Sequence, residues 1–261
     1  ILTNFAIAYQ VLPMSPLFSI ITVTYNAEDT LPATLASVAE QTFRDYEHLI
    51  VDGASKDHTL ELARKTANDR TRIVSEPDRG IYDAMNKGMS MAKGKYYIFL
   101  NAGDAFHSAE TLAGIAEAIK QNDYPGVVYG QTQLVDSERH RIGDRHLTAP
   151  EALTYESFAQ GMVVCHQAFV ALARIAPLYN LKYKFSADYD WCIQCLQHSR
   201  RNVYVPGIMI DYLCEGVTTA NRRASLFERF KIMSHYYGVT KTLLRHFKFI
   251  PRYIAAKKQL K

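Results

Sequence analysis

An amide and a carboxylate follow a short apolar run within four residues of each other. Asn101 and Asp104 belong to the sequence Asn-Ala-Gly-Asp, directly after the run Lys95–Leu100. Asn, Gly and Asp are all favoured in turns, so turn formation alone explains the motif. A turn at the end of a buried strand can also present oxygen ligands to a divalent cation, Mg²⁺ or Mn²⁺. We therefore take Asp104 as a candidate metal ligand, with Asn101 supporting the metal or a ribose.

Two more acidic residues lie at the ends of predicted secondary-structure elements. Asp52 closes the predicted strand Tyr46–Asp52, and Asp188 opens the predicted helix Asp188–Gln197. An ionised carboxylate such as Asp188 can act as a general base, which typically contributes about 10²–10⁴ in rate. Structural interpretations stay open, because Asp52 starts a sequence suited to a loop and helix cap. Asp188 could equally be a favourable charge at a helix N-terminus, as could Asp190.

Strands alternate with helices over the first half of the chain. The segment Phe18–Tyr25 is β-branched and almost continuously apolar, which is typical of a strand covered on both faces. Further strands are predicted at Tyr46–Asp52, Arg72–Ser75, Lys95–Leu100, Val127–Leu134 and Asn202–Tyr212, and helices at Ile81–Ala92, Ser108–Gln121, Asp188–Gln197 and Arg222–Tyr237. This alternation favours a mostly parallel sheet with right-handed crossovers, whereas residues 136–144 read as a polar loop. Ligands then belong at the carboxyl ends of the strands, where Asp52 and Asp104 both lie.

Composition is that of an ordinary globular protein of 261 residues, with 48% hydrophobic content and a net charge of +4. Four cysteines are too few for a disulfide framework, and no leader with a basic start and cleavage site is visible. No apolar stretch approaches the roughly 20 residues of a membrane-spanning helix. We therefore expect a cytoplasmic protein, with any membrane contact peripheral.

The charge is concentrated at the end of the chain. Residues 241–261 hold seven Lys and Arg and no acidic residue, interleaved with aromatic and aliphatic residues. Such a tail could lie on an anionic membrane, at the inner face of the plasma membrane, or pack on its own domain. We expect a main domain over 14–220, a basic helical extension over 221–261, and a natural start at Met14, with 1–13 being upstream or added sequence. Nucleic acid is not an expected partner.

Five segments occur in the order seen in family 2 glycosyltransferases. They are Ile21-Thr-Val-Thr-Tyr-Asn26, Leu49-Ile-Val-Asp-Gly-Ala-Ser-Lys-Asp57, Pro77-Asp-Arg-Gly80 followed by Ala84-Met-Asn-Lys-Gly88, Phe99-Leu-Asn-Ala-Gly-Asp104, and Ala187-Asp-Tyr-Asp-Trp191. The chain resembles this family over roughly residues 16–215, and most closely its bacterial polysaccharide-assembly branch. None of the segments would suffice alone, so the specificity of the resemblance lies in their order.

The resemblance implies an α/β fold of the GT-A type, the nucleotide-diphospho-sugar transferase fold, with a mostly parallel central sheet flanked by helices and a C-terminal helical extension. It implies a hexosyltransferase that moves a sugar from a UDP- or GDP-linked donor to a hydroxyl of a glycan or lipid-linked acceptor, in polysaccharide biosynthesis. The anomeric centre would be inverted. A divalent cation, Mg²⁺ or Mn²⁺, would offset the charge that develops on the diphosphate leaving group.

The same resemblance assigns roles to individual residues. The nucleotide-sugar site would comprise Val23, Tyr25, Glu28, Asp52, Arg79 and Asn101. Val23 and Tyr25 would line the nucleoside pocket, with Glu28 nearby. Asp52 would accept a hydrogen bond from the base, and Arg79 would contact the base or the diphosphate. Asn101 to Asp104 stand at the family's Asp-x-Asp position, with Asp104 at the metal, and Asp188 falls on the catalytic base.

Two departures from the family pattern keep alternatives open. The Asn101–Asp104 motif has fewer acids than usual, and Ala187 stands where a Glu often precedes the base. A catalytically inactive nucleotide-sugar-binding assembly partner is therefore one alternative. A nucleotidyltransferase is another, although it would be expected to carry a Gly-rich, Lys/Arg-containing loop where this chain has Thr24-Tyr-Asn-Ala-Glu28.

Overall fold

The computed structural model describes residues 15–214 and 222–246. In its first half, strands alternate with helices as predicted. The strands are β1 (Phe18–Thr24), β2 (Tyr46–Asp52), β3 (Thr71–Ser75) and β4 (Tyr96–Phe99), and the helices are α1 (Leu31–Ala39), α2 (Thr59–Thr66) and α3 (Ile81–Met91). The four strands pair in the order β3-β2-β1-β4, and all three pairings are parallel. Every residue of β1 and β2 is buried, which agrees with the nearly unbroken apolar run of β1.

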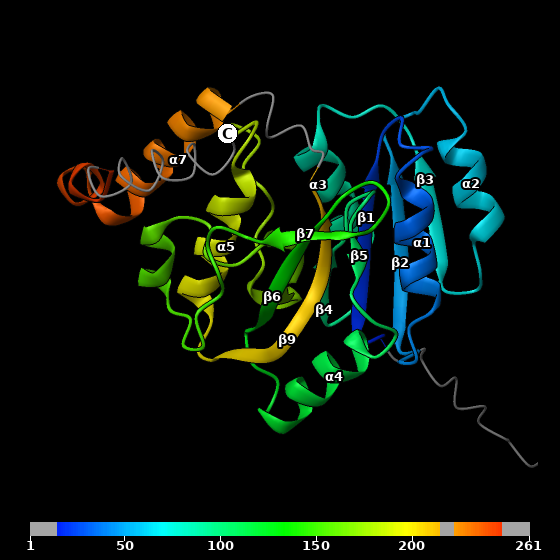
Figure 1. The fold of residues 1–261 in the computed structure, drawn as a ribbon, viewed down its shortest axis with the longest axis horizontal. Coiled ribbons are helices and arrows are strands. Elements are labelled where there is room, and N and C mark those ends of the chain that lie inside the picture. The colour runs from blue at the N-terminus through cyan, green and yellow to red at the C-terminus, as the bar shows by residue number, and fades with distance from the viewer. Residues whose placement is uncertain (1–14, 215–221, 247–261) are drawn as a thin grey trace, which may run out of the picture.

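The second half of the chain is less regular. Its strands and α-helices are β5 (Ala105–Phe106), α4 (Thr111–Gln121), β6 (Val127–Val135), β7 (Arg141–Asp144), β8 (Phe169–Leu172), α5 (Ala187–His198), β9 (Asn202–Leu213) and α7 (Arg222–Tyr237). Three short 3₁₀ helices separate them, namely η1 (Tyr155–Gln160), η2 (His166–Ala168) and η3 (Ala173–Ile175). Figure 1 shows the long, bent β9 as part of the sheet and α7 on the side of the molecule away from β3.

The sheet is mixed rather than mostly parallel. Its order among the described residues is β3-β2-β1-β4-β8-β6-β9-β5, with β7 paired to β6. β8 runs antiparallel to both of its neighbours, so the parallel direction stops at β4. β9 is parallel to β6, whereas β5 and β7 are antiparallel to their partners. The expectation of parallel strands therefore holds for β1 to β4 and for the pair β6 and β9.

Residues 136–144 differ from the loop expected for them. Arg141–Asp144 forms β7, which makes a hairpin with the end of β6. No residue of β7 is buried, and Arg141, Ile142 and Asp144 are exposed. A strand on such a surface needs no alternation of apolar and polar residues, so its sequence resembled a loop.

Two apolar clusters place the helices on opposite faces of the sheet. Ile21 of β1 belongs to the cluster that includes Met85 of α3 and Trp191 of α5. Its neighbour Ile20 belongs to the other cluster, with Ile115 of α4. This alternation is the two-residue period of a strand. The carboxyl ends of β1, β2 and β4 are thereby held between helices (Figure 1).

Helix α7 packs against the main domain. Ile232, Met233 and Tyr237 are buried in the same cluster as Trp191, and the Tyr236 hydroxyl donates to Asp190 of α5 at 2.8 Å. Residues 239–246 form a further helical segment. The expectations for residues 1–13 and for most of the basic tail 241–261 fall outside the described residues. Among residues 15–214 and 222–246, no helix has both the length and the apolar character needed to cross a membrane.

Candidate active site

Asp52 lies at the carboxyl end of β2, and the whole residue is buried. Its Oδ2 accepts hydrogen bonds from the Ser55 N–H at 3.1 Å and from the Ser75 hydroxyl at 2.6 Å. Its Oδ1 accepts from the Ser55 hydroxyl. These donors fix the carboxylate at the edge of the sheet, next in register to Thr24 of β1. Both oxygens of Asp52 are thus engaged by the protein, and its contact with a base N–H stays a prediction.

Tyr25 and Asp78 meet at Gly53, immediately after Asp52. A Cβ atom on Gly53 would lie 2.6 Å from Oδ2 of Asp78 and 3.2 Å from the Tyr25 ring, so only glycine allows this approach. Tyr25 is 62% exposed, which leaves its ring available for stacking. Asp78 is absent from the sequence-based set because Pro-Asp-Arg-Gly has the composition of a turn. Its carboxylate lies beside Gly53, as the Tyr25 ring does.

Val23 and Glu28 are engaged by the protein itself. Val23 is 5% exposed and packs in the core with Val51. The Glu28 carboxylate accepts from the N–H of His58 at 2.8 Å, just before α2. Both residues therefore support the loops around Asp52, and direct contact of either with a nucleoside stays a prediction.

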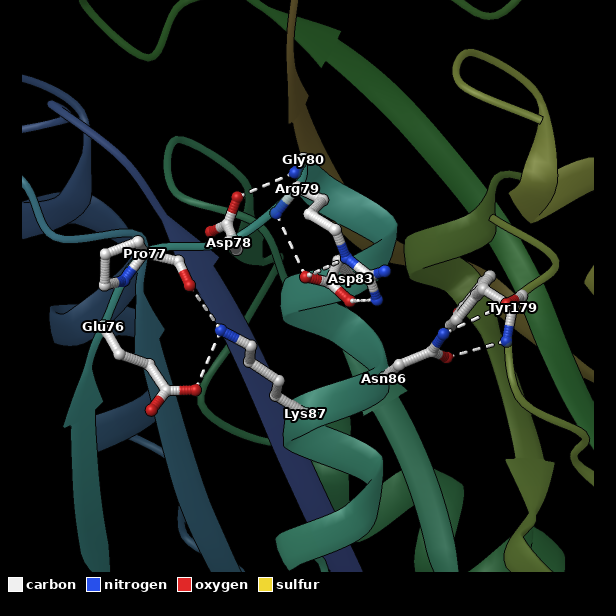
Figure 2. A network of polar contacts seen from close by, with 9 residues as sticks. All are labelled: Glu76, Pro77, Asp78, Arg79, Gly80, Asp83, Asn86, Lys87 and Tyr179. Carbon is white, nitrogen blue, oxygen red and sulfur yellow. Dashed lines mark hydrogen bonds and ion pairs between the residues drawn. The ribbon is translucent and has the colours of Figure 1, made fainter. Parts of the chain in front are cut away.

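Arg79 is held against α3 by Asp83. Its backbone N–H, Nε and Nη2 donate to the Asp83 carboxylate at 3.0, 3.3 and 2.8 Å. Figure 2 shows Arg79 reaching along the helix while Asp78 points away from it. The Arg79 side chain is 77% exposed, so it remains accessible to a ligand. Its contact with the base or diphosphate stays a prediction.

Helix α3 ties the loop before it to a distant segment. Lys87 donates to the Pro77 carbonyl at 2.7 Å and pairs with Glu76 at 2.8 Å. On another side of the helix, the Asn86 amide accepts from the Tyr179 N–H at 2.7 Å and donates to its carbonyl at 3.0 Å (Figure 2). The helix thus fixes the donor-side loop relative to the segment that leads into α5.

The Asn101–Asp104 turn follows β4. The Asn101 carbonyl accepts from the Asp104 N–H at 3.0 Å, whereas its buried Oδ1 has no hydrogen-bond partner within the described residues. Asp104 is 4% exposed. Its Oδ2 accepts from Gln167 at 2.7 Å and its Oδ1 from the Leu213 N–H at 3.1 Å. Burial raises the pKa of Asp104 to about 7.

These contacts are a poor fit for Asp104 as a ligand of a divalent cation. Both of its oxygens bond protein groups, and its burial favours the neutral acid over the anion that a cation requires. In the part of the chain that the structure describes, no cluster of three or more His, Cys, Asp and Glu side chains could hold a metal. The unpartnered Oδ1 of Asn101 fits a cation or a ribose hydroxyl better. The contacts of Asp104 favour a structural role that joins β4 to η2 and β9.

Asp188 lies in the first turn of α5 and is partly buried. Its Oδ1 accepts from the Tyr82 hydroxyl at 3.0 Å and from the Tyr189 N–H at 2.9 Å. No described residue bonds Oδ2. The carboxylate is therefore oriented through one oxygen, and the other keeps its acceptor capacity. Asp190, by contrast, is 3% exposed and bonded to Gln194 and Tyr236.

An aromatic cluster fixes the surroundings of Asp188. The Tyr179 ring stacks on Tyr82 and Trp191, with centroid distances of 5.6 and 5.2 Å. Its hydroxyl hydrogen-bonds Nε2 of His166 at 2.6 Å. His166 is buried, and this burial lowers its pKa to about 4, so it is a satisfied neutral core histidine. The pair His166-Gln167 consequently connects the base region to Asp104.

Asp52 and Asp104 follow β2 and β4, the two parallel neighbours of β1, and so lie at the same edge of the sheet. Asp188 is connected to this edge through Tyr82 of α3, which is buried in the same cluster as Val23 of β1. Asp52 is on β2, separated from β4 by β1. At the end of β1, the Val23 carbonyl accepts from the Ala102 N–H at 3.5 Å.

Arg139 adds a cation that the sequence analysis does not identify. It lies between β6 and β7, and its Nη1 donates to the Gly103 carbonyl at 2.6 Å. Its Nη2 is buried and has no partner among the described residues. A guanidinium beside the Asn101–Asp104 turn is suited to a phosphate oxygen. The only sequence signal was the charged character of residues 136–144.

Sequence relatives point to sugar transfer. A "PGL/p-HBAD biosynthesis glycosyltransferase" of Mycobacterium bovis BCG Pasteur is 37% identical over 219 residues, which cover 81% of this chain and 79% of the relative. The Escherichia coli protein "UDP-Glc:alpha-D-GlcNAc-diphosphoundecaprenol beta-1,3-glucosyltransferase WfgD" is 29% identical, over 76% of this chain and 75% of the relative.

Solved structures show the same fold at low identity. S. aureus TarS 1–349 in complex with UDP-GlcNAc superposes with a TM-score of 0.66 at 19% identity, covering 89% of this chain and 72% of TarS. The mannosyltransferase PcManGT from Pyrobaculum calidifontis, in complex with GDP-Man and Mn²⁺, has a TM-score of 0.61 at 15% identity, covering 95% and 81%. The GT-A type of α/β fold expected from the sequence is confirmed. Residues 19–176 match the family described as "Glycosyl transferase family 2", and the chain belongs to that family.

Proposed function

We propose that this glycosyltransferase moves a sugar from a UDP- or GDP-linked donor to a hydroxyl of a glycan or lipid-linked acceptor, with inversion at the anomeric carbon. Family membership and the activities named for its relatives support glycosyl transfer in polysaccharide or glycolipid synthesis. The observation that carries the inverting mechanism is Asp188, whose Oδ1 is bonded by Tyr82 and Tyr189 while its Oδ2 has no partner in the described chain.

The donor would lie across the ends of β1, β2 and β4. Tyr25 supplies an exposed ring for the base, and Asp52 supplies a fixed acceptor for a base N–H. UDP-GlcNAc in TarS and GDP-Man in PcManGT support a nucleotide-sugar ligand for a protein of this fold. Asn101 Oδ1 offers an unpartnered acceptor to the ribose or to a cation.

The leaving diphosphate needs positive charge. A divalent cation, Mg²⁺ or Mn²⁺, would supply it by neutralising the diphosphate oxygens, and the Mn²⁺ of PcManGT supports this cofactor. Asn101 is the residue of this chain whose free acceptor fits such a cation. Arg139 adds a permanent charge beside the same turn.

Proton transfer takes place on the acceptor side of the site, at Asp188. Oδ2 of Asp188 accepts the proton of the acceptor hydroxyl as that oxygen attacks the anomeric carbon, and the diphosphate leaves from the opposite face. Tyr82 keeps the carboxylate in one orientation through Oδ1. A single attack of this kind inverts the configuration, because the incoming and leaving groups occupy opposite sides of the sugar.

A donor screen followed by a product assay tests the proposal. Thermal shift with UDP- and GDP-sugars, with and without Mn²⁺, should reveal one donor that stabilises the protein by about 2.7 kcal/mol at 100 times its dissociation constant. The product's anomeric configuration, read by NMR, should be opposite to that of the donor. Retention of configuration would contradict the mechanism. Tight donor binding without turnover would favour the alternative of an inactive nucleotide-sugar-binding partner, which the single acid of the Asn101–Asp104 turn makes plausible.

The membrane is a further proposed partner. The basic residues 241–261 would hold the enzyme at the inner face of the plasma membrane, although only 241–246 lie within the described residues. This location would bring the active site close to a lipid-linked acceptor.

A further inference from the structure

A cavity of about 480 Å³ lies between the start of α3 and residues 181–185. Its lining is mainly aliphatic and aromatic and includes Ile81, Tyr82, Leu181 and Phe185. The charged lining residues are Lys184 and the ion pair of Arg79 with Asp83. Tyr82 is shared with the active site, because its hydroxyl donates to Asp188 at 3.0 Å. The cavity is therefore separated from the proposed base by one side chain.

Exposed apolar side chains gather around this cavity and on the helices beside it. Of the eleven large hydrophobic residues exposed in the described chain, eight lie in three segments: the start of α3, residues 178–181, and residues 226–244. They are Ile81, Leu178, Leu181, Leu226, Phe227, Val239, Leu243 and Leu244. An accumulation of this kind marks an interaction surface, whereas singly scattered apolar residues do not.

Direct contacts connect α7 to the cavity and residues 239–246 to α7. The Glu228 carboxylate of α7 accepts from the N–H groups of Lys184 and Phe185, both at 2.8 Å, so α7 borders the cavity. The Phe230 ring of α7 contacts the His246 ring at 5.2 Å, which folds residues 239–246 back onto α7. We call the exposed apolar residues of 226–244 the α7 surface.

The charge of this region complements an anionic partner. Residues 222–261 contain eleven Lys and Arg and one acidic residue, Glu228, which is already engaged by Lys184 and Phe185. The remaining 221 residues contain 19 basic and 25 acidic residues. Lys231 lies over the exposed Phe227 ring at 4.4 Å. Basic groups alternating with exposed Leu and Phe are typical of helices that lie in the headgroup region of an anionic bilayer.

We propose that the α7 surface rests on an anionic membrane and that the cavity beside Tyr82 receives a lipid-linked acceptor from that membrane. The apolar lining would hold the part of the acceptor next to its lipid, and Lys184 would meet its phosphate. The hydroxyl end would then reach Oδ2 of Asp188. The membrane contact stands on its own observations, whereas the acceptor assignment rests on the function proposed above.

Vesicle cosedimentation tests the membrane contact without using activity. Wild type should bind vesicles of phosphatidylcholine with phosphatidylglycerol and leave pure phosphatidylcholine vesicles unbound. The double variant Leu226→Ser with Phe227→Ser should lose about tenfold or more in affinity, since two apolar anchors are removed. Ile142→Ser is the matched control, because Ile142 is 55% exposed but lies on β7.

The membrane contact would be overturned if wild type did not bind anionic vesicles, or if the control lost as much affinity as the double variant. It would also be overturned if wild type formed a concentration-dependent dimer that the double variant did not form. The dimer would identify a second copy of the chain as the occupant. Circular dichroism should show each variant folded as wild type, and donor stabilisation should be unchanged in all of them.

Acceptor kinetics test the cavity. Ile81→Ser should raise the KM for a polyprenyl-diphosphate-linked sugar several-fold, while the KM for the donor and for the methyl glycoside of the same sugar stay as in wild type. An equal rise for both acceptors would refute the acceptor assignment. If the protein bound vesicles but transferred sugar to neither acceptor, both the acceptor assignment and the proposed function would be wrong. The membrane contact would still be supported.

Discussion

The two halves of the active-site edge are built by different means. On the donor side, Asp52 is fixed by hydroxyl and backbone donors from loops that follow parallel strands. On the acceptor side, Asp188 is fixed by Tyr82, which belongs to an aromatic cluster that spans α3, residue 179 and α5. Local backbone geometry therefore sets the first site, whereas packing between distant segments sets the second.

This difference suggests a division of labour. A rigid strand edge suits a donor whose nucleotide is always the same, whereas a surface of helices and short turns can vary with the acceptor. The exposed apolar residues gather on the acceptor side, and the donor side retains Tyr25 as its exposed ring. Changes on the two sides should accordingly affect different kinetic constants.

The largest expected effect is on the acceptor side. Asp188→Asn should lower the rate of transfer by about 10²–10⁴-fold, since the amide cannot take the hydroxyl proton. Steady-state assays with the donor found by screening would measure it. Asp190→Asn is the matched control, because Asp190 bonds Gln194 and Tyr236 and should affect stability more than rate. Equal losses of kcat in the two variants would contradict the assignment.

Each half also buries one histidine, which gives a matched test of stability. Burial lowers the pKa of His48 in β2 and of His166 in η2 to about 4. Below pH 6.5 each histidine binds a proton in the unfolded chain but stays neutral in the folded chain. The free energy of unfolding therefore falls as pH drops from 6.5 towards 4. Each histidine should contribute roughly 3 kcal/mol to this loss.

Urea unfolding of His48→Gln at several pH values would measure how much His48 contributes to the pH dependence of stability. The variant should be less stable than wild type at pH 7, because Thr22 loses its imidazole partner. Its stability should nonetheless decline less steeply on acidification. An unchanged slope would show that His48 is protonated in the folded protein.

A smaller effect is expected from Asp52→Asn. Loss of a hydrogen bond to a charged acceptor costs about 1.5–3 kcal/mol, so the donor dissociation constant should rise about 10- to 100-fold. Ser75→Ala is the control, since it removes one donor to the carboxylate and keeps the charge. Isothermal titration would show whether affinity follows the carboxylate itself. If Ser75→Ala weakened donor binding more than Asp52→Asn did, Asp52 would only support the loop and would not contact the donor.

The smallest effect is predicted for Tyr82→Phe. Removing the hydroxyl that donates to Asp188 should lower kcat by about fivefold, in line with roughly 1 kcal/mol for one hydrogen bond. Steady-state assays would measure kcat, and an unchanged value would show that Tyr82 serves only in packing.

The donor half could largely be predicted from the sequence. β1 and β2 are buried on both faces, so their composition identifies them. On the acceptor side, α7 was predicted with its observed bounds, Arg222–Tyr237. β5 and β8 have two and four residues, too few to show a period. Parallel pairing was overestimated because nothing in β8 itself reveals its direction.

The surroundings of the candidate residues could be predicted only in part, for a similar reason. Asp52 and Asp188 follow from their positions at element ends. The burial of Asp104 depends on Gln167 and Leu213, which are 63 and 109 residues away, and no local pattern contains them. Asp78 and Arg139 lie in loops whose sequences resemble ordinary turns, so their place beside Gly53 and Gly103 required the fold.

The central claim is that the donor binds at the Asp52 edge and that Asp188 performs the proton transfer. Donor titration and single-turnover transfer, measured together on wild type, Asp52→Asn and Asp188→Asn, test it most directly. We predict weakened donor binding in Asp52→Asn and, in Asp188→Asn, wild-type donor binding with almost no transfer. Weak donor binding in Asp188→Asn, or transfer at the wild-type rate by that variant, would contradict the account.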